Sequence, residues 1–162
     1  MRIFGSPVDC LLVRAMCIAM DKELACAAFL HVTYRPDSGM LIGRWLCSIT
    51  EAQLHEGYNA MRKAALEYHC QHWLIDARRR TDRRHNGPEW VVNFFLPQLQ
   101  REMGGPLCVA FLVLPNHLHE IEAEPSYVIK PSNFDSLFQF ARFIDEGAAN
   151  AWLNRELVRV MA

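Results

Sequence analysis

The alternation of apolar and polar residues along the chain predicts a series of short strands separated by helices. Residues 29–49 contain two strand-like segments on either side of Pro36-Asp37-Ser38-Gly39, a composition typical of a turn between antiparallel strands. Three further apolar runs have the length of buried strands: HWLIDA (72–77), LCVAFLVL (107–114) and LFQFARFI (137–144). The pattern therefore predicts five strands.

Two helices are predicted from their capping residues and their spacing. Thr50 and Gln53 match a capping box, in which each side chain accepts a hydrogen bond from a backbone N–H at the start of the helix. Apolar residues then recur every three or four positions, which predicts a helix over residues 51–69. Asp145 is placed to cap a last helix that is rich in alanine.

A third helix is predicted from Pro88 to about Met103, because proline is favoured in the first turn, where its missing N–H is not needed. Pro97 lies inside this helix and is expected to kink it. Residues 116–133 contain two prolines, and no long helix is expected there. Strands and helices that alternate in this way favour an α/β fold with a mostly parallel sheet, in which the first strand is antiparallel as part of a hairpin.

Composition limits the kinds of function that the chain can have. Its 162 residues favour one domain, and no run of about 18 apolar residues predicts a membrane span. The formal net charge is -1, so no global field favours nucleic acid. The six cysteines form no C-x-x-C pair, and several lie in apolar runs, which favours the cytoplasm. Asp9 and Arg14 interrupt the first apolar stretch, so no signal peptide is expected.

Four segments together carry a resemblance to a known family: YRPDSGMLIGRW, TEAQLHEGYNAMRKAALEYHCQHWLIDARR, PEWVVNFFLPQL and CVAFLVLP. In these segments the chain resembles the small bacterial STAS/SEC14-type (SpoIIAA-like) single-domain proteins. The resemblance implies a mixed sheet of about five strands with about four helices, wound as a β-α superhelix. It places residues 1–22 outside the family as an N-terminal extension and residues 23–162 in one STAS-like domain.

The resemblance implies little about chemistry. The better-known relatives bind proteins and are phosphorylated on a serine at the helix after the third strand. Here the equivalent segment is ARRRTDRRHNG, which contains only Thr81 in place of a serine. A phosphorylation switch at the family position is therefore not expected from this sequence.

The arginine-rich loop after the third predicted strand is the strongest candidate site. It contains Arg78, Arg79, Arg80, Arg83 and Arg84 and is followed by Gly87 at the start of a predicted helix. Helix N-termini and arginines both favour anions, and α/β sheets bind ligands beyond the carboxyl ends of their strands. The loop is thus a candidate site for phosphate, a nucleotide or a phosphorylated partner. The alternative is a solvated loop whose arginines pair with neighbouring acids.

Other polar residues are interpreted mainly as structural. Asp76 ends an apolar strand and is expected to accept backbone or arginine hydrogen bonds, because a buried acid needs partners. Histidines occur near positions 69–72 and at His117 and His119, but neither group has a zinc-ligand spacing, so no metal is expected. If residues 117–119 are extended, these two histidines share one face, which keeps an enzymatic role open. No cofactor motif is present.

Three functional hypotheses follow. The first is a non-enzymatic cytoplasmic binding or regulatory module that uses protein contacts or an anionic ligand at the arginine-rich loop. The second is a carrier of a small apolar ligand or lipid, and the third is an enzyme that uses His117 and His119 with nearby acids. An unidentified protein partner is expected, and a homodimer is compatible with the sequence. A sheet covered on one side exposes apolar surface, so residues 1–20 are expected to cover part of it, in the same chain or in a second copy.

Overall fold

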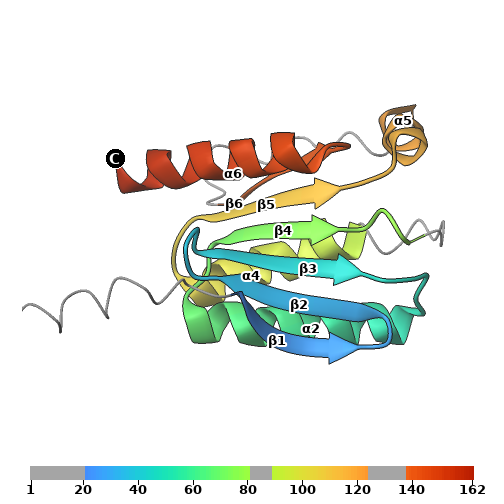
Figure 1. The fold of residues 1–162 in the computed structure, drawn as a ribbon, viewed down its shortest axis with the longest axis horizontal. Coiled ribbons are helices and arrows are strands. Elements are labelled where there is room, and N and C mark those ends of the chain that lie inside the picture. Colours follow the sequence, from blue (N-terminus) through green and yellow to red (C-terminus); the bar gives the residue numbers. More distant parts are fainter. Residues whose placement is uncertain (1–20, 81–88, 124–137) are drawn as a thin grey trace, which may run out of the picture.

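One mixed six-stranded sheet organises the molecule (Figure 1). The computed structural model describes residues 21–80, 89–123 and 138–162. The strands follow one another across the sheet in chain order: β1 (Lys22–Ala27), β2 (Leu30–Arg35), β3 (Met40–Trp45), β4 (His72–Asp76), β5 (Leu107–Leu112) and β6 (Phe138–Phe143). β2 is antiparallel to β1 and to β3, and the strands from β3 to β6 are parallel. The fold is therefore α/β with a mixed sheet, as predicted.

The strand count is the main correction to the predicted sheet, which had five strands. The additional strand is β1, whose sequence KELACA is poor in β-branched and aromatic residues and has no strand signal of its own. It forms by pairing with β2. The prediction that residues 73–76 and 108–114 are neighbouring parallel strands is confirmed, with β5 ending at Leu112.

Two predicted helix starts are confirmed at the level of hydrogen bonds. α2 (Glu51–Tyr68) begins with the complete capping box: the Gln53 N–H donates to Thr50 Oγ1 at 3.2 Å, and the Thr50 N–H donates to Gln53 Oε1 at 2.9 Å. α6 (Glu146–Met161) begins at Asp145, whose carboxylate accepts from the Ala148 N–H at 2.7 Å. These local motifs fix where both helices enter the fold.

The helix around Pro97 shows a wider turn. Its π-helical segment η1 (Val91–Phe95) continues into α4 (Leu96–Met103), and the Leu96 N–H donates to the Val91 carbonyl five residues earlier. Proline has no N–H for the usual ladder and its ring crowds the preceding turn, which accounts for an irregularity at this point. The predicted start at Pro88 lies outside the described residues.

The segment after β5 forms a short helix, α5 (Pro115–Ala123), which is compatible with the expectation that no long helix forms there. The prolines that interrupt the segment come later in the chain, so they do not prevent these nine residues from being helical. Residues 117–119 are therefore helical and not extended, so the condition under which His117 and His119 would share one face is not met. Each residue turns the helix by about 100°, so side chains two positions apart are rotated by about 200° and point to nearly opposite sides.

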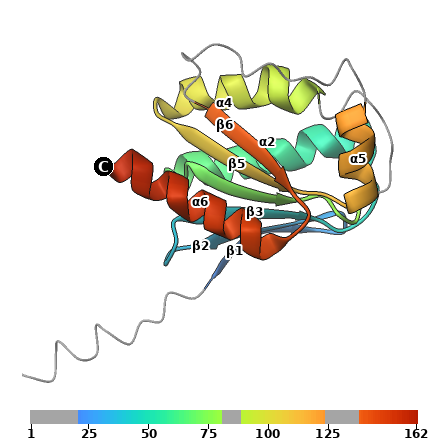
Figure 2. The same ribbon diagram turned by 90° about the horizontal axis from the view of Figure 1, so that it is seen from above.

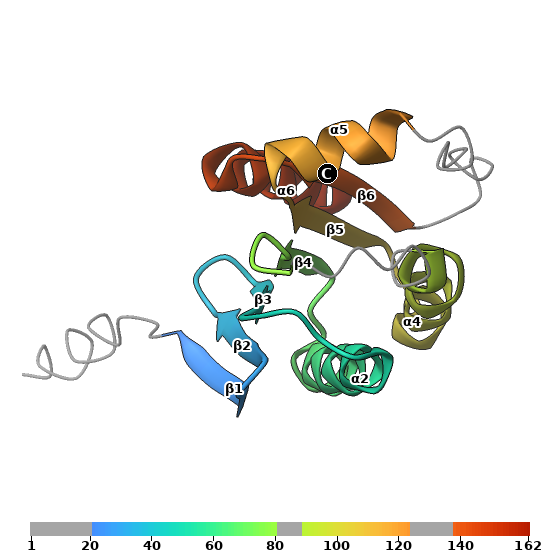
Figure 3. The same cartoon turned by 90° about the vertical axis from the view of Figure 1, so that its right-hand side faces the viewer.

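Helices cover both faces of the sheet and enclose two apolar clusters (Figures 2 and 3). On one face, α2 and the η1–α4 helix pack against Trp45, Trp73 and other side chains of the sheet. On the opposite face, α6 packs through Ala149 and Leu153 on β4, β5 and neighbouring strands. The largest side chains of both clusters are fully buried, and this packing holds the strand ends in place.

α6 covers only part of its face, and the strands beside it carry polar side chains. His31, Thr33 and Arg35 of β2 lie on this face and are partly exposed. His31 contacts Glu23 at 3.3 Å, and Arg35 contacts Asp21 at 3.4 Å. This region is hydrophilic, so among the described residues it is not the apolar surface that residues 1–20 were expected to cover. Those residues themselves lie outside the described part.

Within residues 21–80, 89–123 and 138–162, no helix combines the length and the apolar character that crossing a membrane requires.

Candidate functional site at the carboxyl end of the sheet

The parallel strands finish at one end of the sheet, and charged residues meet there. Arg44 on β3 and Asp76 on β4 are register partners, and the row continues through Leu112 to Phe143. α6 begins three residues after β6, at Glu146. We refer to this region as the carboxyl end of the sheet. Ligands of open α/β sheets bind at this end because loops and helix N-termini converge there.

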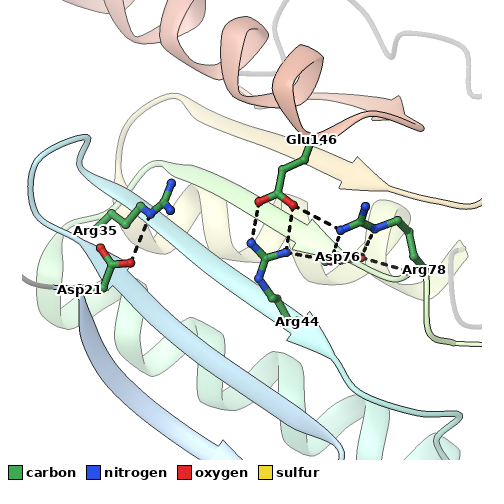
Figure 4. Close-up of polar contacts among 6 residues, drawn as sticks. All are labelled: Asp21, Arg35, Arg44, Asp76, Arg78 and Glu146. Carbon is green, nitrogen blue, oxygen red and sulfur yellow. Dashed lines mark hydrogen bonds and ion pairs between the residues drawn. The ribbon is translucent and has the colours of Figure 1, made fainter.

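Asp76 is the centre of the ion pairs (Figure 4). Its Oδ2 accepts from Arg44 Nη1 at 2.8 Å and from Arg78 Nη2 at 2.7 Å, and its Oδ1 accepts from Arg78 Nε at 2.9 Å and from the Arg78 backbone N–H at 3.2 Å. Burial alone raises the pKa of this carboxyl, but the hydrogen bonds and the positive charge of the two arginines outweigh it. The pKa of Asp76 is therefore lowered, and the group is ionised at neutral pH.

Glu146 reaches the same two arginines from the first turn of α6. Its Oε1 accepts from Arg44 Nη2 at 2.6 Å, and its Oε2 lies 3.3 Å from both Arg44 Nη1 and Arg78 Nη2. The hydrogen bond from Arg44 is the main reason that the pKa of Glu146 is lowered. Arg44, Asp76, Arg78 and Glu146 thus form one connected set, which we call the four-charge network.

The four-charge network has balanced formal charges and an uneven exposure to solvent. Asp76 is the most buried member, with 12% of its side chain exposed, whereas the other three are exposed to between 32% and 35%. Arg79, the residue after Arg78, is exposed and makes no ion pair with the residues that the structure describes. The site therefore presents guanidinium groups to solvent around one buried carboxylate.

Arg80 turns toward the other face of the sheet. Its guanidinium lies 5.6 Å from the centre of the Trp45 ring, a cation–π arrangement. Trp45 packs on Tyr58, which contacts Trp90 in turn, and His55 lies against the Trp90 ring with 3.9 Å between ring centres. Arg80 thus covers a mainly buried aromatic cluster.

The structure describes three of the five arginines of the predicted site. Arg78, Arg79 and Arg80 lie at the carboxyl end of the sheet but point to three different surroundings: the buried acid, the solvent and an aromatic ring. Arg83, Arg84, Gly87 and Thr81 lie outside the described residues. For Asp76, the expected backbone and arginine hydrogen bonds are present.

Sequence reasoning missed two members of the four-charge network as site residues. Arg44 is a charge near the end of the apolar strand MLIGRW, as Asp76 is in HWLID, and this shared position was the available signal. Glu146 is separated from Arg44 by about a hundred residues, and only the packing of α6 brings the two together. Nothing in the local sequence of Glu146 indicates a partner on β3.

His72 and Glu156 are a second set of buried polar residues, toward the other end of the strands. Their exposures are 4% and 8%, and Arg159 lies 3.3 Å from Glu156. His72 Nε2 has no hydrogen-bond partner among the described residues. Burial lowers the pKa of His72, although the charge of Glu156 opposes this. Burial, with a smaller contribution from Glu156, raises the pKa of the nearby Cys108 thiol to about 11, which makes it a poor nucleophile.

The histidines and cysteines do not gather around one point. His69 is exposed in a left-handed conformation at the end of α2, while Cys70 is buried with a thiol pKa raised by burial to about 11. His117 and His119 lie on α5. The described part of the chain contains no group of three or more His, Cys, Asp or Glu side chains placed to hold a metal ion.

Comparisons of the chain with protein-family models, with curated proteins and with solved structures each found no match. The resemblance to STAS-like proteins therefore remains a prediction from the sequence.

Proposed function

We propose that this protein is a non-enzymatic, cytoplasmic, STAS-like binding module that recognises a phosphate-bearing ligand or partner at the carboxyl end of its sheet. The observation that carries the proposal is the convergence of Arg44 and Arg78 on one buried acid. Asp76 holds the two guanidinium groups together with contacts of 2.7–2.9 Å, while about a third of each arginine side chain stays exposed. Guanidinium groups fixed in this way lose little entropy when they bind an oxyanion.

The neighbouring charge supports the same proposal. Arg79 is exposed next to this pair, and the sequence places Arg83 and Arg84 in the following loop. Along the sequence, residues 78–84 contain five arginines and one aspartate, so this segment is basic although the chain as a whole has a net charge of -1. A local patch of this kind attracts an anionic group to one place without favouring the long phosphate backbone of nucleic acid.

Two other hypotheses receive less support from the described residues. A lipid carrier needs an internal cavity, whereas Trp45, Trp73, Tyr58 and Phe95 contact one another in the core with little or no exposure. An enzyme based on His117 and His119 needs both side chains directed to one point, which the helical geometry of α5 disfavours.

The proposal is tested by titrating the protein with inorganic phosphate in low salt and following the heat of binding. Arg79→Gln is the informative variant, because Arg79 is exposed and its loss leaves no buried acid unpaired. Arg101→Gln is the matched control, because Arg101 is also exposed but lies in the last turn of α4. We expect Arg79→Gln to weaken binding and Arg101→Gln to leave it unchanged. Equal binding by both variants, or no heat with the wild-type protein, would contradict the proposal.

A further inference from the structure

We propose that Arg44 and Arg78 form a single phosphate-accepting pair and that Glu146 is its built-in occupant, which an incoming phosphate group displaces. This inference rests on the proposed function, since it concerns the same end of the sheet. It adds a competitor for the ligand, Glu146, which belongs to α6 and not to the arginine-rich loop.

The two acids of the four-charge network are held with different strength. Asp76 accepts four hydrogen bonds between 2.7 and 3.2 Å and lies on a central strand with only 12% of its side chain exposed. Glu146 has one short contact, at 2.6 Å, and two at 3.3 Å, and 32% of its side chain is exposed. Contacts at 3.3 Å lie beyond the usual range for charge-assisted hydrogen bonds. Asp76 is therefore the permanent anchor of the arginines, and Glu146 is the acid that can leave.

The donors around Glu146 suit a phosphate group better than a carboxylate. Arg44 Nη1, Arg44 Nη2 and Arg78 Nη2 all face the Glu146 carboxylate, which has two oxygens to share among three donor nitrogens. A phosphate monoester offers three terminal oxygens and a charge of about -1.5 to -2 at neutral pH. A phosphate group can therefore offer one oxygen to each of the three donor nitrogens, and its larger negative charge strengthens each hydrogen bond. Both effects favour exchange of Glu146 for phosphate.

Displacement of Glu146 does not require α6 to unfold. The helix is capped independently by Asp145, which accepts from the Ala148 N–H at 2.7 Å, and it is anchored by buried Ala149 and Leu153. Only the Glu146 side chain has to rotate toward solvent. The wild-type site therefore contains an intramolecular competitor for an anion, and the affinity of the site is set partly by a residue that never contacts the bound ligand.

The test compares phosphate binding by the wild-type protein with that of Glu146→Gln, using inorganic phosphate as the probe in low salt. Gln removes the competing charge and keeps the shape of the side chain, so we expect binding to be about tenfold tighter. Glu102→Gln is the matched control, because Glu102 also pairs with an arginine, Arg62, at 2.6 Å, but on α4 and α2. We expect no change in that variant.

Further variants make each outcome decisive. Arg44→Gln, introduced into the Glu146→Gln protein, is expected to remove the gain in affinity, because the phosphate then loses two of its donors. Glu146→Ala removes the remaining hydrogen-bond acceptor and is expected to bind at least as tightly as Glu146→Gln.

If folded wild-type and Glu146 variants bind phosphate equally well, Glu146 is not a competitor and this inference is wrong, while the anion site stands. If none of these folded proteins binds phosphate, the proposed function is wrong as well.

Discussion

Arg44 and Asp76 are register partners on neighbouring parallel strands, and the guanidinium of one donates to the carboxylate of the other at 2.8 Å. Side chains of adjacent parallel strands at the same register point to the same face, so this pair is positioned by the sheet itself. Arg78 and Glu146 join the pair from a loop and a helix. The Arg44–Asp76 pair of the candidate site is thus a direct consequence of the alignment of β3 and β4.

Substitution Asp76→Asn is expected to lower the free energy of unfolding at pH 7 by about 2–3 kcal/mol, because two arginines lose their charged acceptor. The pKa of Asp76 is lowered in the folded protein, so its contribution is present above the carboxyl pKa of the unfolded chain and is lost as pH falls through the folded pKa. The variant should therefore also show a weaker loss of stability between about pH 5 and 3. Denaturant unfolding at pH 7 checks the first statement and a series from pH 5 to 3 checks the second, with Glu102→Gln as a more exposed ion-pair control.

The buried His72 should cause a second pH dependence of the stability of the fold, at higher pH than the one caused by Asp76. Burial lowers the pKa of His72 in the folded protein, while Glu156 opposes the shift and Arg159 lies next to Glu156. The unfolded chain therefore binds a proton at His72 more readily, and stability should decrease as pH falls below about 6.5. His72→Gln should reduce this slope between about pH 7 and 5, as measured by denaturant unfolding. An identical slope in the variant would show that His72 does not cause it.

Gly57 on α2 is expected to tolerate no side chain. A Cβ at this position would overlap the buried Trp45 ring, with Trp45 Cζ3 at 2.8 Å and Leu30 Cδ2 at 2.9 Å. Gly57→Ala should lower stability by about 1–3 kcal/mol despite the higher helix propensity of alanine. Asn59→Ala, at an exposed position of the same helix, should change stability by no more than about 0.5 kcal/mol. Thermal unfolding of the two variants provides the comparison.

The cysteines should differ in their reaction with a thiol reagent. Cys47 is exposed, whereas Cys70 and Cys108 are buried and burial raises the pKa of each thiol to about 11. Because thiolates are the reactive form, brief treatment of the native protein with iodoacetamide at pH 7.5 should label Cys47 and leave the other two unlabelled. Peptide mass spectrometry resolves the sites. Labelling of Cys108 at the rate of Cys47 would contradict the described burial.

The elements that could be predicted from the sequence are those with strong local signals. The caps at Thr50 and Asp145 form hydrogen bonds with residues three positions away, so the local sequence is enough to recognise them. The apolar runs of β4 and β5 are recognisable because a continuous apolar run is typical of a buried strand. β1 could not be predicted in this way, because its residues have low strand propensity and the pairing with β2 provides the stabilisation.

The candidate site was predictable in its position but not in its composition. A basic segment after a strand of an α/β sheet indicates the carboxyl end, and three of its arginines lie there in the described part. Arg44 and Glu146 were missed because their importance comes from contacts between distant segments. The sequence predicted that Asp76 accepts hydrogen bonds from an arginine but not which one. Because Arg78 is that arginine, changing every arginine of the loop is expected to cost stability.

The most direct test of the central claim, that the carboxyl end of the sheet binds phosphate, is an NMR titration of ¹⁵N-labelled protein with inorganic phosphate in low salt. We predict that the largest shifts of backbone amide signals occur at Arg44, Arg78, Arg79 and the first turn of α6. Signals near the Arg62–Glu102 pair should not change, because these residues lie on α2 and α4 and do not belong to the four-charge network. Shifts of equal size around both regions, or no shifts at phosphate concentrations that saturate ordinary anion sites, would contradict the account.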